Sequence, residues 1–64
     1  MESRRVIMLI EAEGWMLKGI KGSHHQFYHP QRSGKVTVPH PRKDIAPGAL
    51  KNIERQSGVR LARK

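Results

Sequence analysis

Apolar residues near the start of the chain recur at intervals of three and four, which is the spacing of one face of a helix. Val6, Leu9 and Ile10 form this stripe. Ser3 precedes it and is a residue type that caps helix N-termini, whereas Gly14 follows it and suits the left-handed conformation that ends a helix. The pattern therefore predicts a helix with Ser3 as its N-cap and Gly14 as its C-cap.

In the middle of the chain the pattern is that of strands, with large and branched residues whose side chains would alternate between two faces. The first predicted strand covers residues 15–20, where Trp15 and Leu17 share a face. A third covers residues 35–38, where two valines point inward and Thr37 points outward. Glycine, serine and proline mark the expected turns between the strands, at residues 21–23 and 30–34.

The second predicted strand, residues 24–29, contains three of the four histidines. Phe27 is its obvious inward residue, and His25 and His29 share the face of Phe27 because side chains alternate along a strand. We expect both to be half-buried at the border of the core. The residues on the other face point to solvent: His24, Gln26 and Tyr28. His24 is therefore the imidazole most free to meet a substrate.

A second helix is predicted near the C-terminus, from Pro47 at its first position to Gly58 at its C-cap. Ala46 is a poor N-cap, so a start nearer Asp44 is also open. Residues 59–64 form a basic tail that is ordered only if its two apolar residues, Val59 and Leu61, dock on the domain.

The order helix, three strands, helix predicts one α+β domain over residues 1–64, with a three-stranded antiparallel sheet and both helices on one face. A chain of 64 residues buries a thin core. It has no cysteine and no apolar run near the roughly 20 residues of a membrane span, so we expect a cytoplasmic protein without disulfides or membrane attachment.

The charge favours a polyanionic partner. Thirteen Lys and Arg stand against five Asp and Glu, a formal net charge of +8. Such a balance concentrates nucleic acid near the surface and provides phosphate contacts. An acidic protein partner explains the charge as well. A membrane surface fits less well, because the basic residues are scattered along the chain instead of gathered on one amphipathic helix.

The histidines do not form a recognisable metal site. His25 and His29 lie four strand residues apart, roughly 13 Å, which is too far to share one ion directly. Ser23 and His24 are neighbours in sequence, which also disfavours a catalytic triad. His40 lies between two prolines and either contacts a phosphate or is simply solvated. A single imidazole is nevertheless suited to proton transfer on RNA, which carries its own nucleophile in the 2′-hydroxyl.

Four short segments, in this order, resemble the HicA family of toxin mRNA interferases over almost the whole chain. They are Gly14-Trp15, Gly22-Ser23-His24 with Phe27 three residues on, Val36 to His40, and the Pro47 to Gly58 helix. The resemblance implies a fold like that of the double-stranded RNA-binding domain, metal-independent and cofactor-free cleavage of mRNA, and a HicB-type antitoxin as partner. It also implies that His24 is catalytic. Residues 41–46 match loosely, and the tail after Gly58 is longer and more basic than the family requires.

These observations lead to a ribonuclease hypothesis with His24 as general base or acid. Gly22 and Ser23 would let the phosphate backbone approach closely. The residues expected to hold phosphates are Lys18, Lys21, Lys35 and, less firmly, His40. The alternative is a non-catalytic RNA-binding module of the same fold that reads an A-form duplex by its shape. A third possibility is an interaction protein whose positive surface serves an acidic partner.

Overall fold

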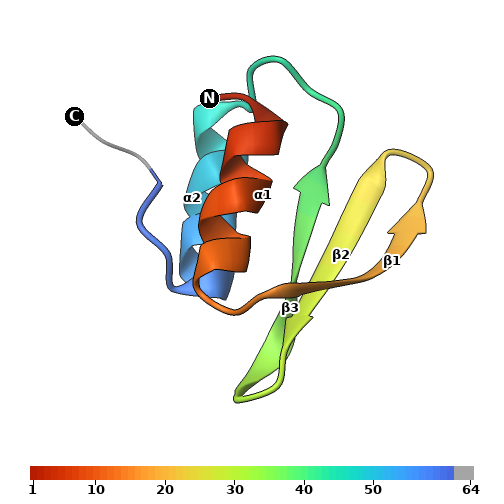
Figure 1. The fold of residues 1–64 in the computed structure, drawn as a ribbon. Helices are drawn as coiled ribbons and strands as arrows, with labels where there is room; N and C mark the ends of the chain where they lie inside the picture. Colours follow the sequence, from red (N-terminus) through yellow and green to blue (C-terminus); the bar gives the residue numbers. More distant parts are fainter. Residues whose placement is uncertain (62–64) are drawn as a thin grey trace.

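The computed structural model describes residues 1–61 and has five elements in the predicted order. They are α1 (Ser3–Ala12), β1 (Met16–Lys21), β2 (His24–His29), β3 (Arg32–Pro39) and α2 (Pro47–Ser57). The strands form one antiparallel sheet in the order β1-β2-β3, and the two helices lie side by side against one face of it (Figure 1). The α+β fold is therefore confirmed. The last three residues of the predicted basic tail, 62–64, lie outside the described residues.

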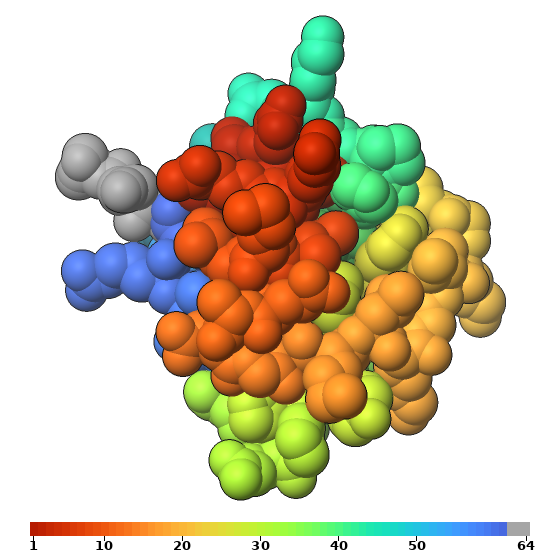
Figure 2. Space-filling view, viewed as in Figure 1, coloured from red at the N-terminus to blue at the C-terminus, as the bar shows by residue number. Residues whose placement is uncertain are grey.

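The hydrophobic core lies between the two helices and β3. Its apolar members are almost completely shielded from solvent: Val6, Ile10, Trp15, Phe27, Val36, Val38, Ile45, Ile53 and Leu61. Both helices contact β3, whereas all six residues of β1 are exposed. In the space-filling view β1 lies beside the surface of α1 and not beneath it (Figure 2). The core therefore stabilises one side of the sheet and leaves β1 as an uncovered edge strand.

Trp15 and Leu17 both lie on the helix side of the sheet, but they differ in burial. Trp15 precedes β1, is 1% exposed, and donates a hydrogen bond from its indole Nε1 to the Ser57 carbonyl at 3.1 Å. Leu17 is 46% exposed. The helical layer does not extend over β1, and the pairing of β1 with β2 is irregular between Leu17 and Gly19.

The predicted N-cap of the first helix is also wrong. Glu2 occupies the N-cap position without a side-chain cap, and Ser3 is the first helical residue. The Ser3 hydroxyl instead bonds to His40 and Arg42, far away in the sequence. The Ser3 side chain makes a tertiary contact and therefore does not cap the helix.

The connection between the second and third strands is shorter than predicted. β2 ends at His29 and β3 begins at Arg32, so the turn contains Pro30 and Gln31 instead of residues 30–34. The Gln31 amide donates to His29 Nδ1 at 3.0 Å, which stabilises this tight turn.

The C-cap predicted for the first helix is one residue too late, because Glu13 occupies that position and Gly14, with a φ of 102°, follows it. Gly58 is the C-cap of α2 as predicted, with a φ of 75°. Pro47 is the first residue of α2, so the alternative start near Asp44 is excluded. Leu61 is 1% exposed, which confirms that the start of the tail docks on the core.

Candidate functional site

His24 stands at the mouth of a tight turn that the glycine before it makes possible. β1 ends at Lys21 and β2 begins at His24, so Gly22 and Ser23 alone connect the strands. Gly22 has a φ of 59°, which fits a type II′ hairpin turn with glycine at its first central position. An added Cβ at Gly22 would meet no atom within 4 Å. The backbone beside His24 is therefore open to a ligand.

The strand register places His24 on the face of the sheet away from the helices, which we call the outer face. His24 pairs with Lys21 of β1 and with Pro39 of β3, and directly opposite residues share a face with Cβ atoms about 4.5–5.5 Å apart. Phe27, on the other face, is buried, while His24 is exposed as predicted. Its ring makes no hydrogen bond within the described residues.

The structure brings together some of the predicted site residues and separates others. Lys21, Gly22 and Ser23 surround His24, and Lys35 lies on the same outer face, opposite Tyr28. Lys18 is exposed at the irregular step of β1. The His40 amide donates a hydrogen bond to the Ser23 carbonyl at 2.8 Å, but the His40 ring lies on the helix side of the sheet.

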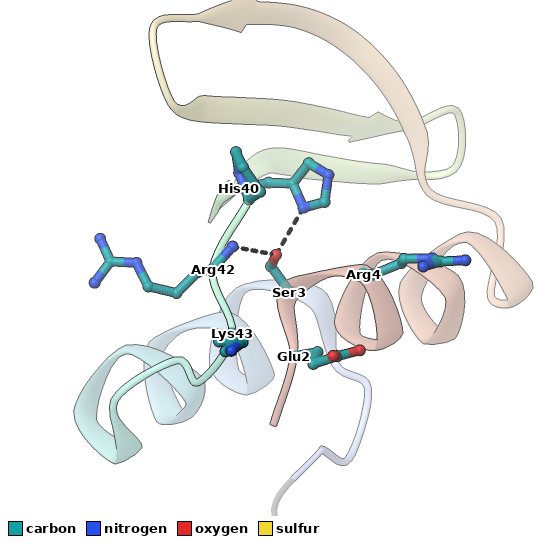
Figure 3. Close-up of a pocket in the computed structure, with 7 residues that line it drawn as sticks. Glu2, Ser3, Arg4, His40, Arg42 and Lys43 are labelled. Atoms are coloured by element: carbon teal, nitrogen blue, oxygen red, sulfur yellow. Dashed lines mark hydrogen bonds between the residues drawn. The ribbon is translucent and has the colours of Figure 1, made fainter.

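A second histidine group, made of Ser3, His25 and His40, lies between α1 and the sheet. The Ser3 hydroxyl is 2.6 Å from His40 Nδ1 and accepts the Arg42 amide hydrogen at 2.9 Å. The rings of His25 and His40 pack edge to face with centroids 4.8 Å apart. These contacts tie the start of α1 to the segment that follows β3 (Figure 3).

A serine hydrogen-bonded to a histidine is the arrangement of an activated nucleophile, but here the serine is buried. Ser3 is 1% exposed. A hollow of about 180 Å³ opens beside it, and the side chains of Arg4 and Arg42 on its rim point in different directions (Figure 3). The Ser3–His40 pair therefore serves the packing of the helical layer, whereas His24 is an exposed imidazole.

All the carboxylate side chains of the molecule lie outside the sheet. The sequence has no Asp or Glu between Glu13 and Asp44, so the whole sheet is free of carboxylates. The strands carry only basic charged side chains: Lys18, Lys21, Arg32 and Lys35. An anionic ligand that approaches His24 therefore meets no repelling group from the sheet.

Within residues 1–61 no three His, Asp or Glu side chains come close enough to hold a metal ion. None of the helices in this range is long and apolar enough to cross a membrane.

Sequence reasoning missed two features of this region. The contact of Ser3 with His40 joins residues 37 positions apart, and the sequence carries no signal for it beyond the residue types. The neighbours of Tyr28 on the outer face depend on the pairing of all three strands. The sequence predicted only that the Tyr28 side chain points to solvent, because side chains alternate around the inward-facing Phe27.

Comparisons with known proteins agree with this architecture. The sequence model of a family described as HicA toxin of bacterial toxin-antitoxin systems matches residues 3–59. A chain from a solved structure entitled "HicA3 and HicB3 toxin-antitoxin complex" is similar to this one, with a TM-score of 0.80 and 32% sequence identity. The alignment covers 97% of this chain and 100% of that one. A search of curated proteins found no match.

Proposed function

The chain belongs to the HicA toxin family, and on that premise we propose that it is a ribonuclease that cleaves mRNA without a metal ion. The observation that carries the proposal is the position of His24. It is exposed, its ring is free of hydrogen bonds among the described residues, and Lys21 stands opposite it on a sheet without carboxylates. A cytoplasmic location follows from the same proposal, because mRNA is found there.

The proposed reaction uses the RNA as its own nucleophile. His24 removes the proton of a 2′-hydroxyl, and the 2′-oxygen attacks the neighbouring phosphorus. The bond from phosphorus to the 5′-oxygen of the next nucleotide breaks, and that oxygen takes a proton from the imidazolium or from water. The products are a 2′,3′-cyclic phosphate and a 5′-hydroxyl. Positioned acid–base groups typically contribute about 10²–10⁴-fold to such steps.

The residues around His24 have supporting roles in this proposal. The ammonium group of Lys21 offsets the negative charge that develops on the phosphate oxygens. Gly22 and Ser23 form the short turn along which the backbone of the substrate approaches. Lys18 and Lys35 hold phosphates farther from the cleaved bond. His40 faces the helices, so its role is in packing and not in direct contact with RNA.

The test compares the parent protein with His24→Ala on a mixed RNA pool that contains a chelator. We expect the parent to cut RNA to products with cyclic phosphate ends and His24→Ala to be inactive. An RNA with 2′-O-methyl groups throughout should resist cleavage, because its nucleophile is blocked. Undiminished cutting by His24→Ala would disprove the assignment of the base. Binding of RNA by the parent without any cutting would favour a non-catalytic module of the same fold.

Control by a HicB-type antitoxin belongs to the same proposal. The similar chain comes from a HicA3–HicB3 complex, and the basic sheet here suits a partner with an acidic contact surface. Such a partner blocks the reaction by covering His24, and charge matching speeds its association. Labelling with diethylpyrocarbonate should modify His24 less in the complex than in the free protein. Equal modification would show that inhibition does not work by masking the site.

A further inference from the structure

The outer face of the sheet forms an ordered array around His24 that extends well beyond it. The register defines three rows across β1, β2 and β3. They are Lys21–His24–Pro39, Gly19–Gln26–Thr37 and Met16–Tyr28–Lys35. No helix covers this side, because both lie on the other face (Figure 1). A ligand that reaches His24 therefore has a continuous surface along β2 on which to lie.

Tyr28 provides an aromatic ring at the far end of this surface. Its side chain is 40% exposed, and it stands between Met16, which is 48% exposed, and the cation of Lys35. No ring contact occupies Tyr28 within the described residues, whereas Trp15, His25 and His29 are all engaged. Proteins that bind single-stranded nucleic acid stack unpaired bases on exposed aromatic rings of this kind.

Gly19 keeps the surface open between the two ends. It pairs with Gln26 in the middle row, and a Cβ added there would meet no atom within 4 Å. Its φ is not positive, so the backbone does not require glycine at this position. The absent side chain leaves the β1 side of the middle row unobstructed, next to Gln26 and between His24 and Tyr28. Four strand residues separate them, roughly 13 Å.

We propose that this outer face binds single-stranded RNA, with a phosphate at His24 and an unpaired base of a nearby nucleotide stacked on Tyr28. The inference rests on the proposed function, because His24 fixes the position of the cleaved bond. Lys21 and Lys35, at opposite ends of the surface, hold the backbone on each side. A duplex keeps its bases paired and stacked inside, so it cannot place one on Tyr28. The substrate class is therefore unpaired RNA.

The test measures binding apart from cleavage, in the His24→Ala background. The probe is a labelled RNA oligonucleotide without secondary structure, compared with the same strand in a fully paired duplex. Tyr28→Ala should weaken binding of the single strand by about 5- to 150-fold, the equivalent of 1–3 kcal/mol for one stacked base. Tyr28→Phe should retain the affinity, because the ring is kept. Binding of the duplex should change little in either variant.

Three further variants separate an effect on the surface from an effect on folding. Gly19→Val should weaken binding of the single strand by obstructing the path while leaving the strand intact. Gly48→Val is its control in α2, at another glycine where an added Cβ meets no atom within 4 Å. Ile20→Ala is the control for Tyr28→Ala, because Ile20 is 59% exposed but pairs with His25 on the helix side of the sheet.

Equal affinities of Tyr28→Ala and Ile20→Ala for the single strand would overturn the inference. So would a duplex that binds as tightly as the single strand and loses affinity with Tyr28→Ala to the same extent. Neither result bears on whether the parent protein cuts RNA. Conversely, a parent protein that cuts no RNA overturns the proposed function, whatever the binding data show.

Discussion

The enclosed group of Ser3, His25 and His40 looks more like an active site than the exposed His24 does, yet His24 is the accessible imidazole. His40 has the hydrogen-bonded serine that an active site would lead one to look for, at 2.6 Å, whereas His24 has no such partner among the described residues. Yet Ser3 is 1% exposed and His24 stands in solvent beside a lysine. Accessibility decides between the two groups, because a nucleophile or base must reach the atom on which it acts.

The same contrast divides β2 into two faces. The residues that face the helices hold the molecule together, and those on the outer face are left free for a ligand. His24 and His25 are adjacent in the chain but belong to different faces. We therefore predict that substitutions on the helix-facing side of β2 change stability, and that substitutions on its outer face change activity.

The largest effect on stability should come from the middle of β2. Phe27→Ala should lower the free energy of unfolding by about 3–5 kcal/mol, since it leaves a cavity in a thin core. Tyr28→Ala, at the next residue, should cost much less, because Tyr28 is 40% exposed. Urea denaturation of both variants measures the difference. Similar losses in the two variants would remove the distinction between the faces.

The second effect concerns the enclosed serine. Ser3→Ala leaves the Arg42 amide and His40 Nδ1 without their partner, which should lower the free energy of unfolding by about 1–3 kcal/mol. RNA cleavage at a temperature where the variant is folded should stay within a fewfold of the parent rate. A folded Ser3→Ala protein that cuts no RNA would make the enclosed group the catalytic one.

These contrasts also show how far the sequence alone reaches. The helices, the strands and the direction of His24 follow from local signals: the apolar stripe of Val6 and Ile10, the turn at Gly22, and the alternation around Phe27. Each depends on residues close together in the chain. The resemblance to HicA toxins added the proposed catalytic role of His24, and the comparisons confirm only the family.

Other features depend on long-range packing that no local pattern contains. The exposure of Leu17 depends on where the helical layer ends, and the role of Ser3 depends on His40, 37 residues away. The short turn after β2 depends on the hydrogen bond from Gln31 to His29. The surroundings of Tyr28 became visible only once the register of β1 and β3 was known.

A third, smaller effect is electrostatic. In the His24→Ala background, RNA affinity should fall steeply with salt, because binding releases counterions. Lys21→Ala and Lys35→Ala should each flatten the slope of log affinity against log salt by roughly 0.7–1 unit if each lysine contacts one phosphate. Lys18→Ala should do the same, and Arg5→Ala on α1 serves as the control. An affinity that is indifferent to salt would argue against RNA as the partner of the basic sheet.

The smallest effect lies where the N-terminus meets the loop between β3 and α2. The N-terminal amine bonds to the Asp44 carboxylate at 2.6 Å and holds the pKa of that group below its ordinary value of 3.8. The ion pair therefore adds a little stability above pH 3.8, which is lost as the pH falls through the lowered folded pKa. Asp44→Asn should remove this part of the acid dependence of thermal unfolding and leave RNA cleavage unchanged. An unaltered acid profile would show that the pair contributes nothing measurable, as many exposed pairs do.

The measurement that tests the central claim most directly is a matched comparison of His24→Ala and His25→Ala, assayed for RNA cleavage and thermal unfolding under the same conditions. We predict that His24→Ala loses cleavage by about 10²–10⁴-fold and unfolds close to the parent temperature. We predict that His25→Ala keeps its cleavage rate and unfolds at a lower temperature, since it loses the ring contact with His40. Loss of cleavage in His25→Ala with an active His24→Ala would contradict the assignment of function to the outer face.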